Sequence, residues 1–207
     1  MPRTIRTALC AAATVVCAAF SLPATAAQAA EETPRNPVVR GGDTLHAAGG
    51  VACTVGFNVR RGTLYYALLP PSCVNLATTW YADPALTVPA GSRVASTTQV
   101  GVVQYTNPAV SHPGEVNLLN GTTVDITAAG TPASGQPYCH VGQVSGQRCG
   151  TWGTAASACS TPGDLGGPAF SGTTALGLIA RNNGVCPTGT TTYWPISVIN
   201  QFGLSVY

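Results

Sequence analysis

The chain has 207 residues, of which only 8% are charged, and its nine Lys plus Arg residues nearly balance seven Asp plus Glu residues. A chain so close to neutral, without a basic cluster, excludes the electrostatic surface that nucleic-acid binding requires. Its eight cysteines predict instead a protein stabilised by disulfides.

Residues 1–29 predict a secretory signal peptide. Arg3 and Arg6 form a basic start, residues 8–20 are almost all apolar, and Ala27-Gln28-Ala29 offers a small-x-small cleavage site. The apolar run is shorter than the ~20 residues of a membrane-spanning helix. We therefore expect a secreted, extracellular protein with no membrane association after signal removal. Residues 30–37 would form a flexible leader, and residues 38–207 one folded domain.

The folded part consists of short apolar or β-branched runs separated by Gly, Pro and Asn. These runs cover residues 51–59, 63–69, 100–105, 124–127, 136–141, 174–180 and 190–195. Their length and spacing predict an all-β barrel or sandwich. Asn120-Gly121 predicts a hairpin turn with positive φ at both central residues; with Thr122 it also forms a glycosylation sequon, but the turn needs no further assumption. Only residues 196–202 predict a helix, which would be short.

Six cysteines remain outside the predicted signal peptide: Cys53, Cys73, Cys139, Cys149, Cys159 and Cys186. An even number in an exported chain predicts disulfides, although spacing alone leaves fifteen pairings open. A zinc site is disfavoured because no Cys-x-x-Cys pair occurs. The three histidines, His46, His112 and His140, are too scattered to predict a metal site, and no cofactor is expected.

Several motifs in order show that residues 38–207 resemble the streptogrisin branch of the chymotrypsin-like (S1 family) serine proteases. They are Cys53-Thr54-Val55-Gly56-Phe57-Asn58-Val59, Gln104-Tyr105-Thr106-Asn107-Pro108, Leu119-Asn120-Gly121-Thr122, Pro162-Gly163-Asp164-Leu165-Gly166-Gly167, Thr174-Ala175-Leu176-Gly177-Leu178 and Tyr193-Trp194-Pro195. The resemblance implies two six-stranded antiparallel β-barrels with a cleft between them and a short C-terminal helix. It also implies the disulfides Cys53–Cys73, Cys139–Cys149 and Cys159–Cys186. Only nine residues separate Cys149 from Cys159, so the second barrel is expected to be abbreviated.

The same resemblance implies that the catalytic triad is degenerate. The family's histidine falls at Ser72, its aspartate at Gln99 and its nucleophilic serine at Leu165. Leucine has no hydroxyl to activate, and a triad loses several powers of ten in rate when one member is removed. The Gly163-Asp164-Leu165 turn would still resemble an oxyanion hole.

The substrate groove also departs from the family pattern. Ala180, Arg181 and Asn182 stand where active relatives have Ser-Gly-Gly beside the specificity pocket. Arg181 would either project into the groove or point to solvent, because strand residues alternate faces. His140 stands where relatives often have an arginine that pairs with the aspartate of the turn, and we hypothesise that it pairs with Asp164.

These features predict a secreted, non-catalytic protease homologue, a pseudoprotease that binds a protein or peptide, as a monomer. One alternative is an active secreted serine-type endopeptidase with rearranged catalytic residues, using Ser72 or a histidine brought in from elsewhere. Another is an extracellular structural protein stabilised by its disulfides. Fold resemblance cannot choose between them, because one fold supports many functions.

Overall fold

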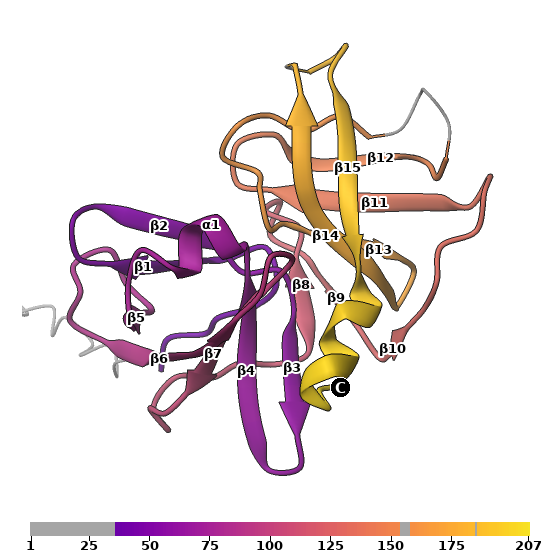
Figure 1. Cartoon of the computed structure of the whole chain (residues 1–207). Helices are drawn as coiled ribbons and strands as arrows, with labels where there is room; N and C mark the ends of the chain where they lie inside the picture. The colour runs from indigo at the N-terminus through magenta and orange to yellow at the C-terminus, as the bar shows by residue number, and fades with distance from the viewer. Residues whose placement is uncertain (1–35, 154–157, 185) are drawn as a thin grey trace, which may run out of the picture. The chain divides into compact units, whose positions relative to one another are not determined.

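The computed structural model describes residues 36–207 except 154–157 and 185 (Figure 1). The predicted signal peptide and nearly all of the predicted leader lie outside the described residues. No helix in the described part is long and apolar enough to cross a membrane.

The first half of the described chain forms a seven-stranded antiparallel sheet with the strand order β2-β1-β5-β6-β7-β4-β3. Its strands are β1 (Thr44–Ala47), β2 (Val51–Thr54), β3 (Asn58–Arg61), β4 (Leu64–Leu69), β5 (Thr79–Tyr81), β6 (Pro89–Ser96) and β7 (Gly101–Tyr105). The run predicted over residues 51–59 is therefore two strands, with a break at residues 55–57. A four-residue helix, α1 (Pro71–Val74), follows β4 and was not predicted.

The second half forms a six-stranded sheet with the order β10-β14-β13-β11-β12, in which β15 pairs with β14. Its strands are β10 (Ala128–Ala129), β11 (Pro137–Gly142), β12 (Gly146–Thr151), β13 (Pro168–Ser171), β14 (Thr174–Asn183) and β15 (Thr190–Pro195). All pairs are antiparallel except β10 with β14. The 3-10 helix η1 (Ile196–Phe202) forms over the residues predicted to be helical.

A two-stranded ribbon of β8 (Glu115–Asn117) and β9 (Thr123–Asp125) lies between these sheets in the sequence. The predicted hairpin is confirmed, but its turn differs from the predicted type. Positive φ occurs at Leu119 and Gly121, not at Asn120, and the Leu118 N–H donates to the Thr122 carbonyl. The connection is therefore longer than a two-residue turn.

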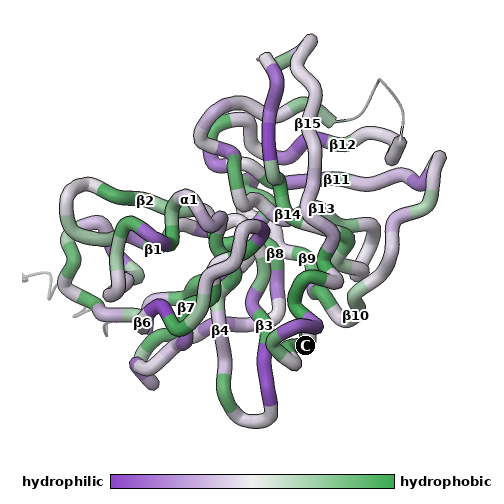
Figure 2. Tube along the Cα trace, in the orientation of Figure 1, coloured by the Kyte–Doolittle hydropathy of each residue, from purple (hydrophilic) through white to green (hydrophobic). Residues whose placement is uncertain are grey.

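The apolar run of β4 is explained by burial on both of its faces. Ala67 and Leu69 pack in one hydrophobic cluster with Trp80 of β5, while Leu68 packs in a second cluster that reaches Leu178 of β14. Successive strand residues point to opposite faces, so a strand between two clusters must be apolar throughout. Figure 2 shows, in contrast, that β14 changes from hydrophobic to hydrophilic residues along its length.

Three disulfides join Cys53 to Cys73, Cys139 to Cys149 and Cys159 to Cys186, which are the pairings implied by the family resemblance. The first holds α1 against β2, and the second joins directly opposed residues of β11 and β12. The all-β class is thus confirmed. The sheets contain seven and six strands, with a separate ribbon of two.

Candidate functional site

The glycine-rich turn at residues 161–167 is held in place by the carboxylate of Asp164, which is fully buried. This carboxylate accepts hydrogen bonds from the backbone N–H groups of Thr161 (2.7 Å), Val144 (2.8 Å) and Ser145 (3.0 Å). Burial alone would raise the pKa of Asp164, but these hydrogen bonds outweigh burial and hold the pKa below its ordinary value. Asp164 therefore fixes the turn onto the β11–β12 hairpin.

Two backbone donors in this turn have no hydrogen-bond partner in the part of the chain that the structure describes. The Asp164 N–H donates to the Thr161 carbonyl (3.1 Å), whereas the N–H groups of Gly163 and Leu165 make no hydrogen bond within the described chain. Gly163 has a φ of 102°, a conformation that favours glycine. Both positions that flank Asp164 therefore have N–H groups without a partner among residues 36–153, 158–184 and 186–207.

The turn packs closely against the end of β4. A Cβ on Gly166 would lie 2.4 Å from Cδ of Pro70, and a Cβ on Gly56 would lie 2.8 Å from the Gly166 carbonyl oxygen. Both glycines are needed where the two halves of the domain approach each other. This contact brings α1, which begins at Pro71, beside the turn.

Ser72 and Leu165 line a single surface pocket at this junction, with a volume of about 250 Å³. Its lining residues, from both halves of the domain, are Ala52, Pro70, Ser72, Cys73, Leu76, Gly163 and Leu165. Cys73 is bonded to Cys53, so the Ser72 hydroxyl is the one side-chain group among the described lining residues that can exchange a proton. Among the described residues, no acidic, basic or histidine side chain lines the pocket.

Gln99, the third predicted triad position, is not among the residues that line the pocket. It lies half-buried in the turn before β7, where its N–H donates to Oγ1 of Thr97 (3.2 Å). Val74 of α1 packs against Gly101 at the start of β7, so this turn and α1 adjoin. The structure therefore brings Ser72 and Leu165 together but joins neither to Gln99 by a hydrogen bond.

Known proteins with related sequences and structures are bacterial serine proteases. Serine protease 2 of Streptomyces fradiae is 34% identical over 175 residues, which cover 74% of this chain and 100% of the relative. Streptogrisin-A of Streptomyces griseus is 31% identical over 82% of this chain and 61% of its own length. The solved structure of alpha-lytic protease homolog N4 superposes with a TM-score of 0.69 at 38% identity, over 82% of this chain and 100% of that structure.

The chain belongs to the streptogrisin-like serine proteases. No protein-family model matches it. Membership shows the chymotrypsin-like fold and the protease ancestry.

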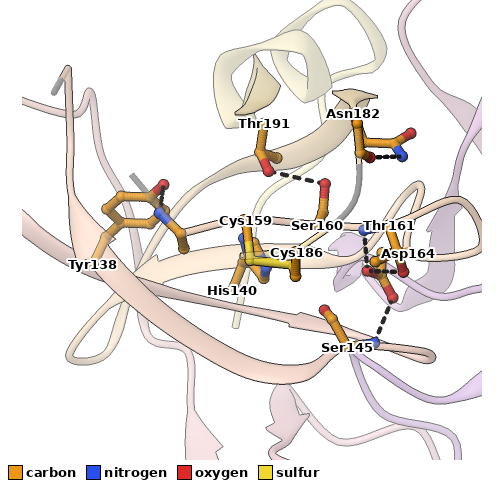
Figure 3. The surroundings of a disulfide bond; sticks show 12 residues. Tyr138, His140, Ser145, Cys159, Ser160, Thr161, Asp164, Asn182, Cys186 and Thr191 are labelled. Carbon is orange, nitrogen blue, oxygen red and sulfur yellow. Dashed lines mark hydrogen bonds between the residues drawn. A yellow bond between two sulfur atoms is a disulfide. The ribbon is translucent and has the colours of Figure 1, made fainter. Parts of the chain in front are cut away.

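Residues 180–182, which the sequence predicts to form an altered substrate groove, lie near the end of β14. Arg181 pairs with Thr192 of β15, and both residues are exposed. Asn182 pairs with Thr191, whose hydroxyl donates to Oγ of Ser160 at 2.9 Å (Figure 3). Arg181 makes no hydrogen bond or ion pair within the described residues, so it points to solvent, one of the two orientations that the sequence left open.

His140 is fully buried, and the hypothesis that it pairs with Asp164 is wrong. Its Nδ1 bonds the hydroxyl of Tyr193 at 2.7 Å, and its Nε2 has no hydrogen-bond partner among the described residues. Burial lowers the pKa of His140 to about 4, although the charge of Asp164 and the nearby Cys159 carbonyl oppose this shift. The four hydrogen-bond donors around Asp164 already satisfy its carboxylate, so no place is left for the imidazole.

Two residues beside the pocket were not singled out by the sequence. Leu76 lines the pocket two residues after α1, and Val144, in the β11–β12 turn, lies 2.8 Å from the position of a Cβ on Gly163. The signal for both was an isolated apolar residue in a polar, turn-forming segment. Such single residues are common on protein surfaces, so nothing in the sequence distinguishes these two.

Proposed function

We propose that this chain is a secreted, non-catalytic streptogrisin-like protein that binds a protein or peptide without cleaving it. The observation that carries the proposal is the chemistry of the pocket at Ser72 and Leu165. Acyl transfer by a serine protease needs a nucleophile, a base within hydrogen-bond reach and an orienting group. Here the described lining of the pocket supplies one hydroxyl and no base.

The histidines do not provide a replacement base. His112 stacks on Tyr105, with ring centroids 4.6 Å apart, and contacts Tyr65 at the same distance. His140 is buried against Tyr193, and His46 lies on β1, paired with Tyr81 of β5. None of the three lines the pocket, which supports a loss of hydrolysis rather than its rearrangement.

A second candidate function is hydrolysis with Ser72 as nucleophile. It is favoured by the exposed Ser72 hydroxyl and by Gly163 and Leu165 of the same pocket, whose N–H groups have no partner within the described chain. The relatives are named as serine proteases, which gives this candidate weight. It requires an external base, because nothing in the pocket lining can accept the proton of Ser72.

The two candidates are separated by activity assays on protein purified from the medium of a secreting host. We expect no hydrolysis of casein or fluorogenic peptides and no labelling by a fluorophosphonate, with Streptogrisin-A as positive control. Cleavage or labelling that disappears in Ser72→Ala would overturn the proposal. Sequencing the amino terminus of the purified protein tests secretion, because the proposal expects residues 1–29 to be missing.

A matched gain-of-function variant tests the reason for inactivity. The triple substitution Ser72→His, Gln99→Asp and Leu165→Ser restores the residue types of the triad on the same scaffold. Fluorophosphonate labelling of the triple variant, but not of Leu165→Ser alone, would support the assignment of these three positions. Equal labelling of both variants would contradict it.

A further inference from the structure

Strand β12 forms an open edge of the second sheet. It lies at the end of the strand order and pairs only with β11 among the described strands. The edge runs over six residues, Gly146–Thr151, without a proline, and its register with β11 contains no bulge. Proteins usually shorten, bend or cover such an edge, because its free backbone groups can pair with another chain.

Two other sheet ends in the described chain are protected in these ways. On the outer side of β3, Arg60 and Ser205 exchange two backbone hydrogen bonds, of 2.8 and 2.9 Å, so the C-terminal segment covers that edge. Strand β10, at the opposite end of the second sheet from β12, is only two residues long. Strand β12 is neither short nor covered by another described strand, and its central residues are exposed.

The hydrogen-bond pattern between β11 and β12 identifies the free backbone groups. The Trp152 N–H donates at 2.8 Å to the carbonyl of Gln136, which lies opposite it when the register is extended by one step. In an antiparallel pair, such residues alternate with residues whose backbone groups point away from the partner strand. Gln147 and Cys149 therefore point their N–H and carbonyl groups away from β11. None of these four groups has a hydrogen-bond partner among the described residues.

An unpaired positive charge lies between these two residues. The Arg148 side chain is exposed and makes no hydrogen bond or ion pair within the described residues. Opposite charges that face each other across two strands stabilise the pairing, whereas like charges oppose it. The edge therefore favours an acidic strand. It disfavours a second copy of β12, which would bring another Arg148 to the same ladder.

We propose that β12 binds an extended, acidic segment of a partner protein, which adds a strand to the open edge of the second sheet. The added strand would exchange backbone hydrogen bonds with Gln147 and Cys149, and an Asp or Glu between the bonded residues would face Arg148. This edge shares no residue with the pocket of Ser72 and Leu165. The proposal therefore goes beyond the function assigned to the pocket and does not depend on it.

The test uses capped pentapeptides, acetyl-Thr-Val-Xaa-Val-Thr-amide with Xaa as Glu or Lys, titrated into the ¹⁵N-labelled protein. Val and Thr favour an extended strand, and the two Val residues would bond Gln147 and Cys149. We expect the Glu peptide to shift the amide signals of Gln147 and Cys149 saturably and to bind about fivefold more tightly than the Lys peptide. Equal affinities, or no saturable shift of these two amides, would overturn the proposal.

A peptide that cannot pair tests the backbone contacts separately from charge. N-methylation of both Val residues removes their donors and keeps the Glu, so it should abolish the saturable shifts. The unmodified Glu peptide should also slow amide hydrogen exchange at Gln147 and Cys149. Equal binding of the methylated peptide would show attraction by charge alone and would contradict strand addition.

Reversal of the charge provides the matched comparison. In Arg148→Glu the preference should reverse, so that the Lys peptide binds about fivefold more tightly than the Glu peptide. Arg181→Glu is the control, because Arg181 is also exposed on a strand and makes no hydrogen bond within the described residues. An unchanged preference in Arg148→Glu, or an equal reversal in Arg181→Glu, would refute a local site at β12.

Measurements on the free protein distinguish a partner strand from a second copy. We expect a monomer by light scattering, in which the amides of Gln147 and Cys149 exchange rapidly with solvent. A dimer in which both amides are already protected would show that a second copy occupies the edge, and this result would overturn the proposal.

Discussion

The hydroxyl of Tyr193 bonds both the Nδ1 of His140 (2.7 Å) and the hydroxyl of Tyr138 (2.9 Å). The Tyr138 hydroxyl in turn accepts the Ala158 N–H at 3.1 Å. Strands β11 and β15 and Ala158 are thereby connected by one largely buried chain of hydrogen bonds. Buried networks of this kind stabilise a unique arrangement when satisfied and are costly when one member is removed.

Tyr193→Phe should destabilise the protein by about 1–3 kcal/mol, because it leaves His140 Nδ1 buried without its partner. The free energy of unfolding, measured by urea denaturation, checks this. Tyr81→Phe is the control, since the Tyr81 hydroxyl makes no hydrogen bond in the described structure. A double-mutant cycle with Tyr138→Phe should show coupling, and strict additivity would contradict a shared network.

Stability should fall on acidification below pH 6.5 because of His140. Its pKa is about 4 in the folded protein and near 6.5 in an unfolded chain, so the unfolded state binds the proton more readily. The contribution of neutral His140 to the free energy of unfolding, about 3 kcal/mol, is fully present above pH 6.5 and is lost as the pH falls toward 4. The slope of unfolding free energy against pH should flatten in His140→Asn but not in His46→Asn. Equal slopes in the wild type and His140→Asn would contradict the assignment.

Asp164→Asn should lower the free energy of unfolding at pH 7 by at least about 2 kcal/mol. The new amide N–H groups would face backbone N–H donors, and the charge-assisted hydrogen bonds would be lost. The pKa of Asp164 is below its ordinary value in the folded state, so its contribution is present above about pH 4 and is lost on further acidification. Thermal melting at pH 7 compares this variant with Asp125→Asn, whose side chain is exposed on β9. Equal melting temperatures for the two variants would refute the anchoring role.

Gly166→Ala should be far more damaging than Gly121→Ala. Both glycines have positive φ (85° and 89°), so each substitution carries a similar backbone cost of about 1 kcal/mol. A Cβ on Gly166 would also lie 2.4 Å from Cδ of Pro70, whereas none lies within 4 Å at Gly121. We expect Gly166→Ala to lower the free energy of unfolding by about 2 kcal/mol more than Gly121→Ala does, as measured by urea denaturation. Similar losses would show that the turn can move away from Pro70.

Strand prediction succeeded where apolar or β-branched residues follow one another and failed where pairing alone holds a strand. Thr190–Pro195 and Ile196–Phe202 have the predicted limits, and β4 was visible as an apolar run. Strand β12 shows no alternation of apolar and polar residues. It is held by its pairing with β11, in a register that places Cys149 opposite its disulfide partner Cys139. Strand β6 begins at Pro89 and contains a bulge between Arg93 and Ala95. A proline and a bulge both interrupt the regular pattern by which a strand is recognised in a sequence.

Residue identity alone decides what chemistry is possible at the site. Leu165 cannot attack a carbonyl and Ser72 cannot replace an imidazole, whatever fold surrounds them. Those conclusions needed only the sequence and its resemblance to a protease family. Which groups meet depends on strand register and on contacts between distant segments. The tertiary structure therefore decided that Ser72 and Leu165 share a pocket that Gln99 does not line, and that Leu76 and Val144 lie beside it. It also decided that His140 bonds Tyr193, because nearer donors already satisfy the carboxylate of Asp164.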